Sequence, residues 1–207
     1  VELIERIEDK MGLITLAMTM AYKGGVNYQD TFGVTAIWES IIYRKLLQEK
    51  TVSFVERPDS PKSKFAGGYV KEPHVGAHDW VVSFDLNSLY PNIIVQWNMS
   101  PETLVSQSET SGVEYYLASP PVEAPYTVAA NGSTYRKDID GVIPRIIEDY
   151  YDDRRSIKKM MLAAESSYQK EKTNQLEKEI NTLNNQQMAI KILMNSLYGA
   201  LGNQYFK

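Results

Sequence analysis

Residues 80–91 read Trp80-Val-Val-Ser-Phe-Asp85-Leu-Asn-Ser-Leu-Tyr-Pro91. The mostly apolar run predicts a strand over residues 80–85, central in a sheet, that ends in a single carboxylate. A tight turn follows, and Pro91 predicts a short helix because proline is tolerated in the first helical turn. A carboxylate at a strand end, followed by free backbone N–H groups, can hold a divalent metal and a triphosphate side by side. This arrangement favours nucleotide chemistry.

A second informative region is a long helical tract after Pro144. Two helices are predicted, over residues 144–170 and 174–198, each with apolar or long side chains at alternating spacings of four and three. The two seams are Tyr150, Arg154, Ile157, Met161, Ala164, Tyr168 and Leu176, Ile180, Leu183, Gln187, Ile190, Met194, Leu197. Such seams predict an antiparallel helical hairpin.

The hairpin brings cations together. With a reversal near residues 171–174, Arg154 and Lys191 each lie ~28 Å from the tip at the usual helical rise, and therefore side by side. Lys158 is one turn from Arg154 on the same face, and Asn195 and Tyr198 continue the face of Lys191. An Arg, Lys, Lys cluster suits a triphosphate, because Arg forks onto phosphate oxygens and Lys adds a compact charge. The competing interpretation is a plain coiled-coil hairpin with solvated charges.

The rest of the chain is less distinctive. Helices are predicted over residues 1–22 and 35–49, a linker over residues 56–64, and a glycine turn leading into a short strand over residues 65–70. Residues 100–141 predict short strands and loops, with turns at residues 131–132 and 140–141. The expected fold class is α+β: a small β-sheet with flanking helices plus a long antiparallel helical hairpin.

Bulk composition narrows the function. The 207-residue chain has a net charge of −4 and a pI near 5.3, so any nucleic-acid surface is a local patch. It has no cysteine, which excludes disulfides and thiolate zinc sites. No apolar run reaches membrane-spanning length, so no membrane role and a cytoplasmic location are expected. The chain opens at Val1 inside a helical pattern, which favours a piece of a larger protein.

The two main stretches resemble motifs of family B DNA polymerases. Residues 85–91 resemble the family's first conserved motif, and Lys191-Ile-Leu-Met-Asn195-Ser-Leu-Tyr198-Gly199 resembles its fingers-helix motif. Residues 65–73 resemble the loop that joins the exonuclease and polymerase regions. The likeness is strongest to the replicative polymerases of tailed bacteriophages and covers nearly the whole chain. It implies an exonuclease end and linker at 1–64, a partial palm at 65–142, a fingers hairpin at 143–199 and a return to the palm at 200–207.

The resemblance also implies roles near Asp85. Asp85 would be one of two aspartates that bind two catalytic Mg²⁺ ions, and the Leu86 carbonyl would be a further ligand. The backbone N–H groups of Ser88 and Leu89 would hold triphosphate oxygens. Tyr90 would lie under the incoming sugar and exclude a 2′-hydroxyl.

Further roles fall on the hairpin and the glycine turn. Arg154, Lys158 and Lys191 would grip the triphosphate, and Asn195 would orient it. The residues that would pack against the template and the nascent base pair are Tyr198, Gly199, Gly67 and Gly68. The reaction would be attack of a primer 3′-hydroxyl on the α-phosphate of a dNTP.

This sequence departs from the family in two ways. Asn92 stands where serine is more usual, a small change. The later Tyr-Gly-Asp-x-Asp-type motif, which supplies the second metal aspartate, is not in these residues. Tyr151-Asp152-Asp153 is a decoy because it lies inside a helical pattern, and the sequence 138–141 is better interpreted as a turn than as a calcium loop.

We therefore expect a fragment of a DNA-directed DNA polymerase with little or no activity alone. Its expected partners are primer–template DNA, a dNTP, a sliding clamp, and a second chain or domain that carries the missing motif. The competing hypotheses are a helical-hairpin interaction module without nucleotide chemistry, and a DNA-binding element that never meets a nucleotide.

Overall fold

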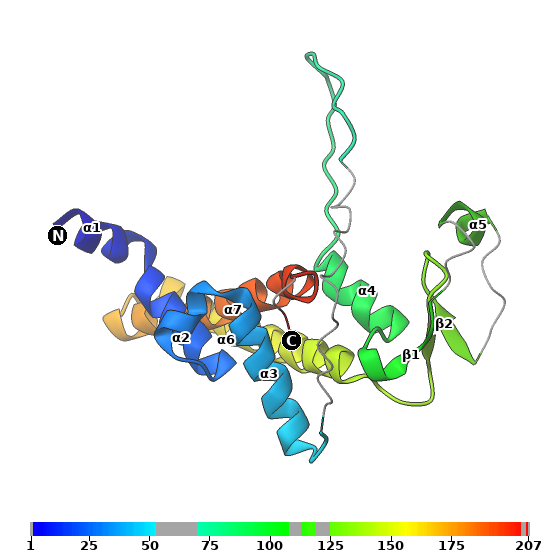
Figure 1. Ribbon diagram of the computed structural model, residues 1–207. Helices are drawn as coiled ribbons and strands as arrows, with labels where there is room; N and C mark the ends of the chain where they lie inside the picture. Colours follow the sequence, from blue (N-terminus) through cyan, green and yellow to red (C-terminus); the bar gives the residue numbers. More distant parts are fainter. Residues whose placement is uncertain (1, 53–69, 108–112, 119–124, 204–205, 207) are drawn as a thin grey trace.

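The structure, a computed structural model, describes residues 2–52, 70–107, 113–118, 125–203 and 206 (Figure 1). The described part is mostly helical with one small sheet. Its elements in chain order are α1 (Glu2–Met11), α2 (Leu13–Gly24), the 3-10 helix η1 (Tyr28–Phe32), α3 (Val34–Gln48), α4 (Leu89–Trp97), the 3-10 helix η2 (Pro101–Thr103), β1 (Leu104–Ser106), α5 (Val113–Ala118), β2 (Tyr126–Val128), β3 (Thr134–Arg136), α6 (Val142–Lys170) and α7 (Asn174–Leu201).

The predicted hairpin is confirmed, and it is the central element on which α2, α3 and α4 pack. Helices α6 and α7 run side by side and reverse between Lys170 and Asn174 (Figure 1). Thr173 starts α7 as its N-cap, because its hydroxyl accepts the Leu176 N–H at 3.3 Å. The two seams pack through Ile157 and Ile190, both buried. The spacing of the apolar residues therefore fixed the pairing of these two helices.

The main core lies at the base of the hairpin, where α3 and α4 pack on it. Trp38 of α3 is fully buried, and its indole N–H donates to the Leu193 carbonyl at 3.2 Å and lies 3.1 Å from Ser196 Oγ. Both partners belong to α7, so the Trp38 side chain is one of the links between α3 and the hairpin. The members of the core cluster are Ile37, Trp38, Ile41, Ile94, Val142, Ile143, Ile146, Ile147, Leu193, Leu197 and Ala200.

The expected small sheet is present. It has three antiparallel strands in the order β1-β3-β2, with Tyr126 opposite Arg136 and Val128 opposite Thr134. The predicted turn at residues 131–132 joins β2 to β3, where Gly132 has a positive φ of 85° that a side chain would disfavour. The α+β fold class is thus confirmed.

The strand predicted over residues 80–85 is wrong. These residues form no strand, and they belong to a segment that projects away from the helices (Figure 1). Trp80 is 98% exposed and Phe84 is 91% exposed. A strand needs neighbours that satisfy its backbone N–H and C=O groups. Within the described residues every strand lies in the β1-β3-β2 sheet, and none pairs with this segment.

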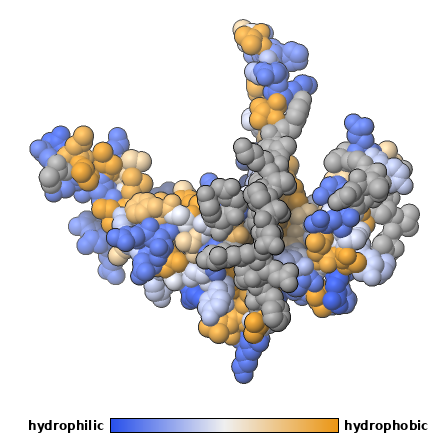
Figure 2. Space-filling view, viewed as in Figure 1, coloured by the Kyte–Doolittle hydropathy of each residue, from blue (hydrophilic) through white to orange (hydrophobic). Residues whose placement is uncertain are grey.

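The single helix predicted over residues 1–22 is also wrong in one respect. Gly12 takes a left-handed conformation (φ 60°) and divides it into α1 and α2. Apolar side chains of both helices stay exposed, among them Ile4 at 67% and Met18 at 56%, and apolar surface is visible on these helices and on the projecting segment (Figure 2). The expected linker, 56–64, and the glycine turn lie outside the described residues, apart from Val70, which is not in a strand. Among the described helices, none is both long and apolar enough to cross a bilayer.

The two tryptophans Trp38 and Trp80 give a matched test of this fold. Replacing Trp38 with Ala should lower the free energy of unfolding by about 3–5 kcal/mol, because it leaves a cavity in the core. Replacing Trp80, which is 98% exposed, should change it by less than about 0.5 kcal/mol. Urea denaturation followed by far-UV circular dichroism measures both. Equal losses in the two variants would contradict the assigned core.

Candidate functional site

The loop after the projecting segment and the hairpin face each other across a cleft. The cleft has a volume of about 430 Å³ and is lined by Asp85, Leu86, Asn87, Ser88, Leu89, Tyr90, Arg154, Lys191 and Asn195. One wall is therefore formed by residues 85–88, which we call the carboxylate loop, and by the start of α4. The other wall comes from both helices of the hairpin. Arg154 of α6 and Lys191 of α7 lie at the same level because the hairpin is antiparallel.

A second cavity of about 440 Å³ adjoins the first and shares Asn87, Ser88 and Arg154 with it. It adds further α6 side chains, namely Tyr151, Arg155 and Lys158. We call the two cavities together the cationic cleft. Among its lining residues, Asp85 is the one carboxylate and the cations are Arg154, Arg155, Lys158 and Lys191. A chain with a net charge of −4 thus concentrates positive charge in one place.

Arg154 is the least satisfied cation of the cleft. Its Nε is buried and has no hydrogen-bond partner among the described residues. A buried N–H without a partner costs free energy, and an acceptor delivered by a ligand removes that cost. The cleft therefore presents a guanidinium that is arranged to accept an anion.

The carboxylate loop enters α4 through a left-handed residue. Ser88, the N-cap of α4, has φ 50° and ψ 46°, and its side chain makes no capping hydrogen bond. The Asn92 amide donates to the Asn87 carbonyl at 2.9 Å, and this bond closes the turn. Ser88, Leu89 and Tyr90 line the cleft, and the first N–H groups of a helix have no partner within it, so those of α4 are donors suited to phosphate oxygens. Asn92 therefore has a structural role, because its side chain closes this turn.

Two aromatic rings meet at the edge of the cleft. Tyr90 of α4 and Tyr198 of α7 are stacked, with ring centroids 4.6 Å apart and an angle of 8° between the planes. Each ring remains partly exposed, at 42% and 37%. One turn of α4 is thereby positioned against α7. A Cβ added to Gly199 would meet no atom within 4 Å, so the backbone beside Tyr198 is open to an approaching group.

Polar contacts tie α4 to the start of α6. Asn98, the C-cap of α4, has φ 53°, and its Nδ2 donates to the carbonyls of Arg136 at 2.7 Å and Ile139 at 2.8 Å. Its Oδ1 accepts the Gly141 N–H at 2.8 Å. A Cβ on Gly141 would lie 2.7 Å from the Ser100 side chain, so glycine is needed for this close approach. Asn98 therefore fixes the end of α4 against the segment that begins α6.

The next residues cap α6 from a distance. The Val142 N–H donates to Glu102 Oε1 at 2.5 Å, and the Ile143 N–H donates to Ser100 Oγ at 3.4 Å. A carboxylate at a helix N-terminus also interacts favourably with the helix dipole. Since α4 forms one wall of the cationic cleft and α6 the other, these contacts set the distance between the walls. We call the set Asn98, Ser100 and Glu102 the polar clamp.

The structure brings together most of the residues singled out from the sequence. Asp85, Leu86, Ser88, Leu89, Tyr90, Arg154, Lys158, Lys191 and Asn195 all line the cationic cleft. Tyr198 stacks on Tyr90, and Gly199 lies beside it within α7 rather than at its end. Gly67 and Gly68 lie outside the described residues.

Sequence reasoning missed Asn87, Tyr151 and Arg155 in the cleft, and it missed the polar clamp. Arg155 follows Arg154 directly and could have been found from the doubled charge. The Ser100-Pro101-Glu102-Thr103 run carries a capping box, which the structure forms. The 151–153 decoy lies inside α6 as expected, where Asp153 pairs with Lys23 at 2.8 Å.

The donor set suits a phosphate chain better than a pair of metal ions. Among the residues that the structure describes, no group of three His, Cys, Asp or Glu side chains is arranged to hold a metal. Within the cleft, Asp85 and the Leu86 carbonyl are oxygen ligands of the kind that Mg²⁺ prefers. These residues can contribute to a magnesium site but do not complete one.

Comparison with known proteins adds independent information. Residues 33–206 match the model of "DNA polymerase family B". The chain is 30% identical to the DNA-directed DNA polymerase of Enterobacteria phage T4 over 250 aligned positions, covering all of this chain and 28% of that protein. It is 29% identical to the enzyme of Escherichia phage RB69, covering 98% of this chain and 27% of that one. It is also 38% identical over 141 residues to the DNA polymerase of Thermococcus gorgonarius, covering 68% and 15%. The chain thus spans under a third of the length of these relatives.

The polar clamp can be tested through Asn98. Replacing it with Gly keeps the left-handed conformation and removes three hydrogen bonds, so the free energy of unfolding should fall by about 1–3 kcal/mol. Asn98→Ala should cost roughly a further 0.5–1 kcal/mol, because alanine disfavours a positive φ. Chemical denaturation gives both values. Two variants as stable as the wild type would show that the clamp does not hold α4 to α6.

Proposed function

The chain belongs to DNA polymerase family B, and from that premise we propose that it carries the dNTP-binding part of a DNA-directed DNA polymerase. The whole protein would add deoxynucleotides to a primer 3′-hydroxyl under template direction and release pyrophosphate. The single observation that carries this proposal is the cationic cleft. There a carboxylate loop and the N-terminus of α4 face Arg154, Lys191 and Asn195 across about 430 Å³.

The chemistry of the cleft suits a triphosphate. Arg154 and Lys191 neutralise phosphate charge from both helices of the hairpin, and Lys158 extends that surface by one turn of α6. The buried Arg154 Nε lacks a partner among the described residues, and a phosphate oxygen can provide one. Backbone N–H groups at Ser88 and Leu89 donate from the opposite wall. Asn195 of α7 orients the bound phosphates.

The Tyr90 ring selects the sugar. It is held flat against Tyr198, 4.6 Å away, so it cannot easily yield to an added group. A nucleotide whose phosphates occupy the cleft would place its sugar over this ring, where a 2′-hydroxyl collides with it. Tyr198 and the open backbone at Gly199 then face the nascent base pair. We extend that packing role to Gly67 and Gly68, which the structure does not describe.

Asp85 and the Leu86 carbonyl would serve as ligands to magnesium in the complete enzyme. When bound, Mg²⁺ neutralises the charge that develops on the phosphate oxygens. This chain contributes one carboxylate to the cleft, and its sequence lacks the second aspartate motif. We therefore propose that it has little or no activity alone and that a further domain or chain supplies the missing aspartate. Primer–template DNA and a sliding clamp complete the proposed partners.

Nucleotide binding tests the proposal directly. Wild-type chain should bind Mg²⁺–dATP, and Lys191→Ala and Arg154→Ala should each weaken binding roughly tenfold or more, because each removes a charge-assisted contact. Isothermal titration calorimetry measures the affinities. The matched control is Lys178→Ala, an exposed lysine of α7 nearer the hairpin tip, which should leave binding unchanged.

Two outcomes would favour the competing hypotheses. Absence of dATP binding in the wild type, with a hairpin indifferent to both substitutions, would favour an interaction module. Salt-sensitive affinity for duplex DNA, unaffected by Asp85→Ala and unaccompanied by dATP binding, would favour a DNA-binding element.

Sugar selection is a separate prediction. Tyr90→Ala should narrow the difference in affinity between Mg²⁺–dATP and Mg²⁺–ATP, because the ring that excludes the 2′-hydroxyl is gone. Competition titrations of the two nucleotides on one sample measure the ratio. Tyr198→Phe serves as the control, since it keeps the stacked ring pair. An unchanged ratio in Tyr90→Ala would refute the role of Tyr90.

A further inference from the structure

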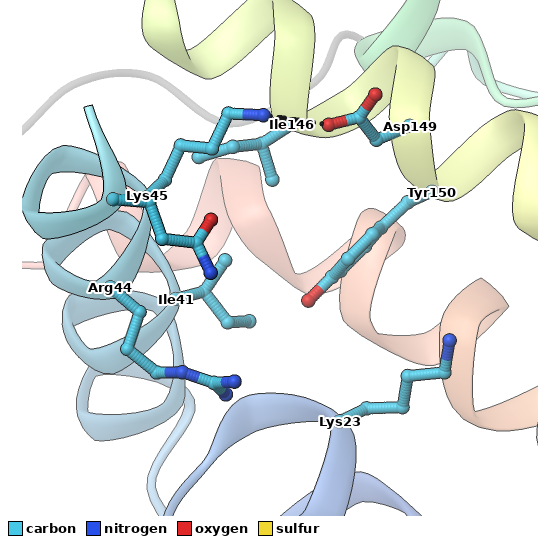
Figure 3. Close-up of a pocket in the computed structure, with 8 residues that line it drawn as sticks. Lys23, Ile41, Arg44, Lys45, Ile146, Asp149 and Tyr150 are labelled. Atoms are coloured by element: carbon cyan, nitrogen blue, oxygen red, sulfur yellow. Dashed lines mark hydrogen bonds and ion pairs between the residues drawn. The ribbon is translucent and has the colours of Figure 1, made fainter.

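A third cavity, outside the cationic cleft, lies where the N-terminal helices meet α6. Its volume is about 210 Å³, and its lining comes from α2, α3 and α6: Lys23, Ile41, Arg44, Lys45, Gln48, Ile146, Asp149 and Tyr150. Figure 3 shows the guanidinium of Arg44 and the hydroxyl of Tyr150 directed toward the same space, with the apolar side chain of Ile41 beside it. The proposed nucleotide chemistry uses none of these residues.

The two lysines of this cavity are already paired. Lys23 Nζ lies 2.8 Å from Asp153 Oδ2. Lys45 Nζ lies 2.9 Å from Asp149 Oδ2, a pair that Figure 3 shows. Each of the two lysine side chains is only 25% exposed. These pairs join α2 and α3 to α6 and hold the cavity walls in place. Their charges largely cancel, so neither pair alone attracts a ligand.

Two donors in the cavity have no acceptor. Among the described residues, Arg44 forms no ion pair or hydrogen bond, and the Tyr150 hydroxyl has no hydrogen-bond partner. The guanidinium of Arg44 is seated against Gly25, where any Cβ would collide with it. Burial raises the pKa of Tyr150 to about 12, so its hydroxyl remains a donor at neutral pH. A guanidinium and a phenol, neither of them bonded to a described protein acceptor, thus line the same cavity.

We propose that this cavity, which we call the Arg44 pocket, binds a single phosphate group that carries one negative charge. With the lysines paired, Arg44 supplies one net positive charge, which a monoanion balances. The Arg44 fork, the Tyr150 hydroxyl and the Gln48 amide are donors for its oxygens. The pocket's volume of about 210 Å³ is about half that of either cavity of the cationic cleft, which suits one phosphate group better than a triphosphate. Free phosphate and a phosphodiester of a nucleic-acid backbone share this chemistry.

The Arg44 pocket is separate from the cationic cleft. On α6 it uses Ile146, Asp149 and Tyr150, whereas the cleft uses Tyr151, Arg154, Arg155 and Lys158. Tyr150 and Tyr151 point about 100° apart around the helix. The Tyr150 ring is also packed against Trp38, 6.2 Å between centroids, and therefore lies on the core side of α6. Loss of one site should leave the other intact.

The test uses the whole chain with Arg154→Ala and Lys191→Ala as background, so that the cationic cleft does not compete for phosphate. Inorganic phosphate is titrated in one arm, and a thymidine dinucleotide with one phosphodiester in the other. The readout is the NMR shift of the Gly25 amide and the Arg44 Nε–H. Phosphate should shift both signals, and Arg44→Gln should weaken binding about tenfold or more. Tyr150→Phe should weaken it several-fold without disturbing the fold.

The control is Arg6→Gln, which removes an equal charge from the exposed face of α1 and should leave the titration unchanged. Shifts with both probes support the proposal and identify a nucleic-acid backbone as the source. Shifts with inorganic phosphate alone support it and identify the free anion. Absence of shifts with either probe, or equal binding by Arg44→Gln, would overturn it.

Discussion

The antiparallel pairing of α6 and α7 is the constraint on which the rest of the structure depends. Ile157 and Ile190 are buried in the seam between the two helices, so sliding one helix along the other would expose apolar surface. The packing of the apolar seam therefore also fixes how the charged residues beside it are aligned between the two helices. Arg154 and Lys191 share one level of the hairpin because Ile157, one turn from Arg154, and Ile190, next to Lys191, are packed together. A cleft that recognises anions thus follows from hydrophobic packing.

One kind of interaction holds α3 and α4 against the hairpin, and another sets the orientation of α4. Apolar burial brings α3 and α4 onto the hairpin, with Trp38 as the largest fully buried side chain. Apolar contacts have little directional preference, however, and α4 buries only Pro91 and Ile94. The polar clamp provides direction, because Asn98 and Glu102 bond particular backbone groups at the start of α6. The stacked Tyr90–Tyr198 pair fixes the other end of α4 against α7.

The sequence predicted what depends on local periodicity and missed what depends on distant neighbours. The helices, the hairpin and the level of Arg154 with Lys191 follow from residue spacing alone. The prediction of a strand at 80–85 was wrong because an apolar run indicates residues that favour burial but does not identify the strands they would pair with. Gly12 lies inside the helical pattern of residues 1–22, yet whether a helix breaks at a glycine depends on the tertiary contacts of the segments on either side. The polar clamp and the Tyr90–Tyr198 stack join residues about 40 and 110 positions apart, which no window of local sequence contains.

The charge of the cleft depends on helical phase as much as the core does. Asp149 and Asp153 are one turn apart on α6 and pair with Lys45 and Lys23, so these acids are neutralised on the side that faces α2 and α3. Arg154 and Lys158, also one turn apart, face the cleft instead. One residue, and so about 100° of rotation, separates Asp153 from Arg154. The adjacent acid and base in the sequence are therefore sorted onto two faces, which explains how an acidic chain presents a cationic cleft.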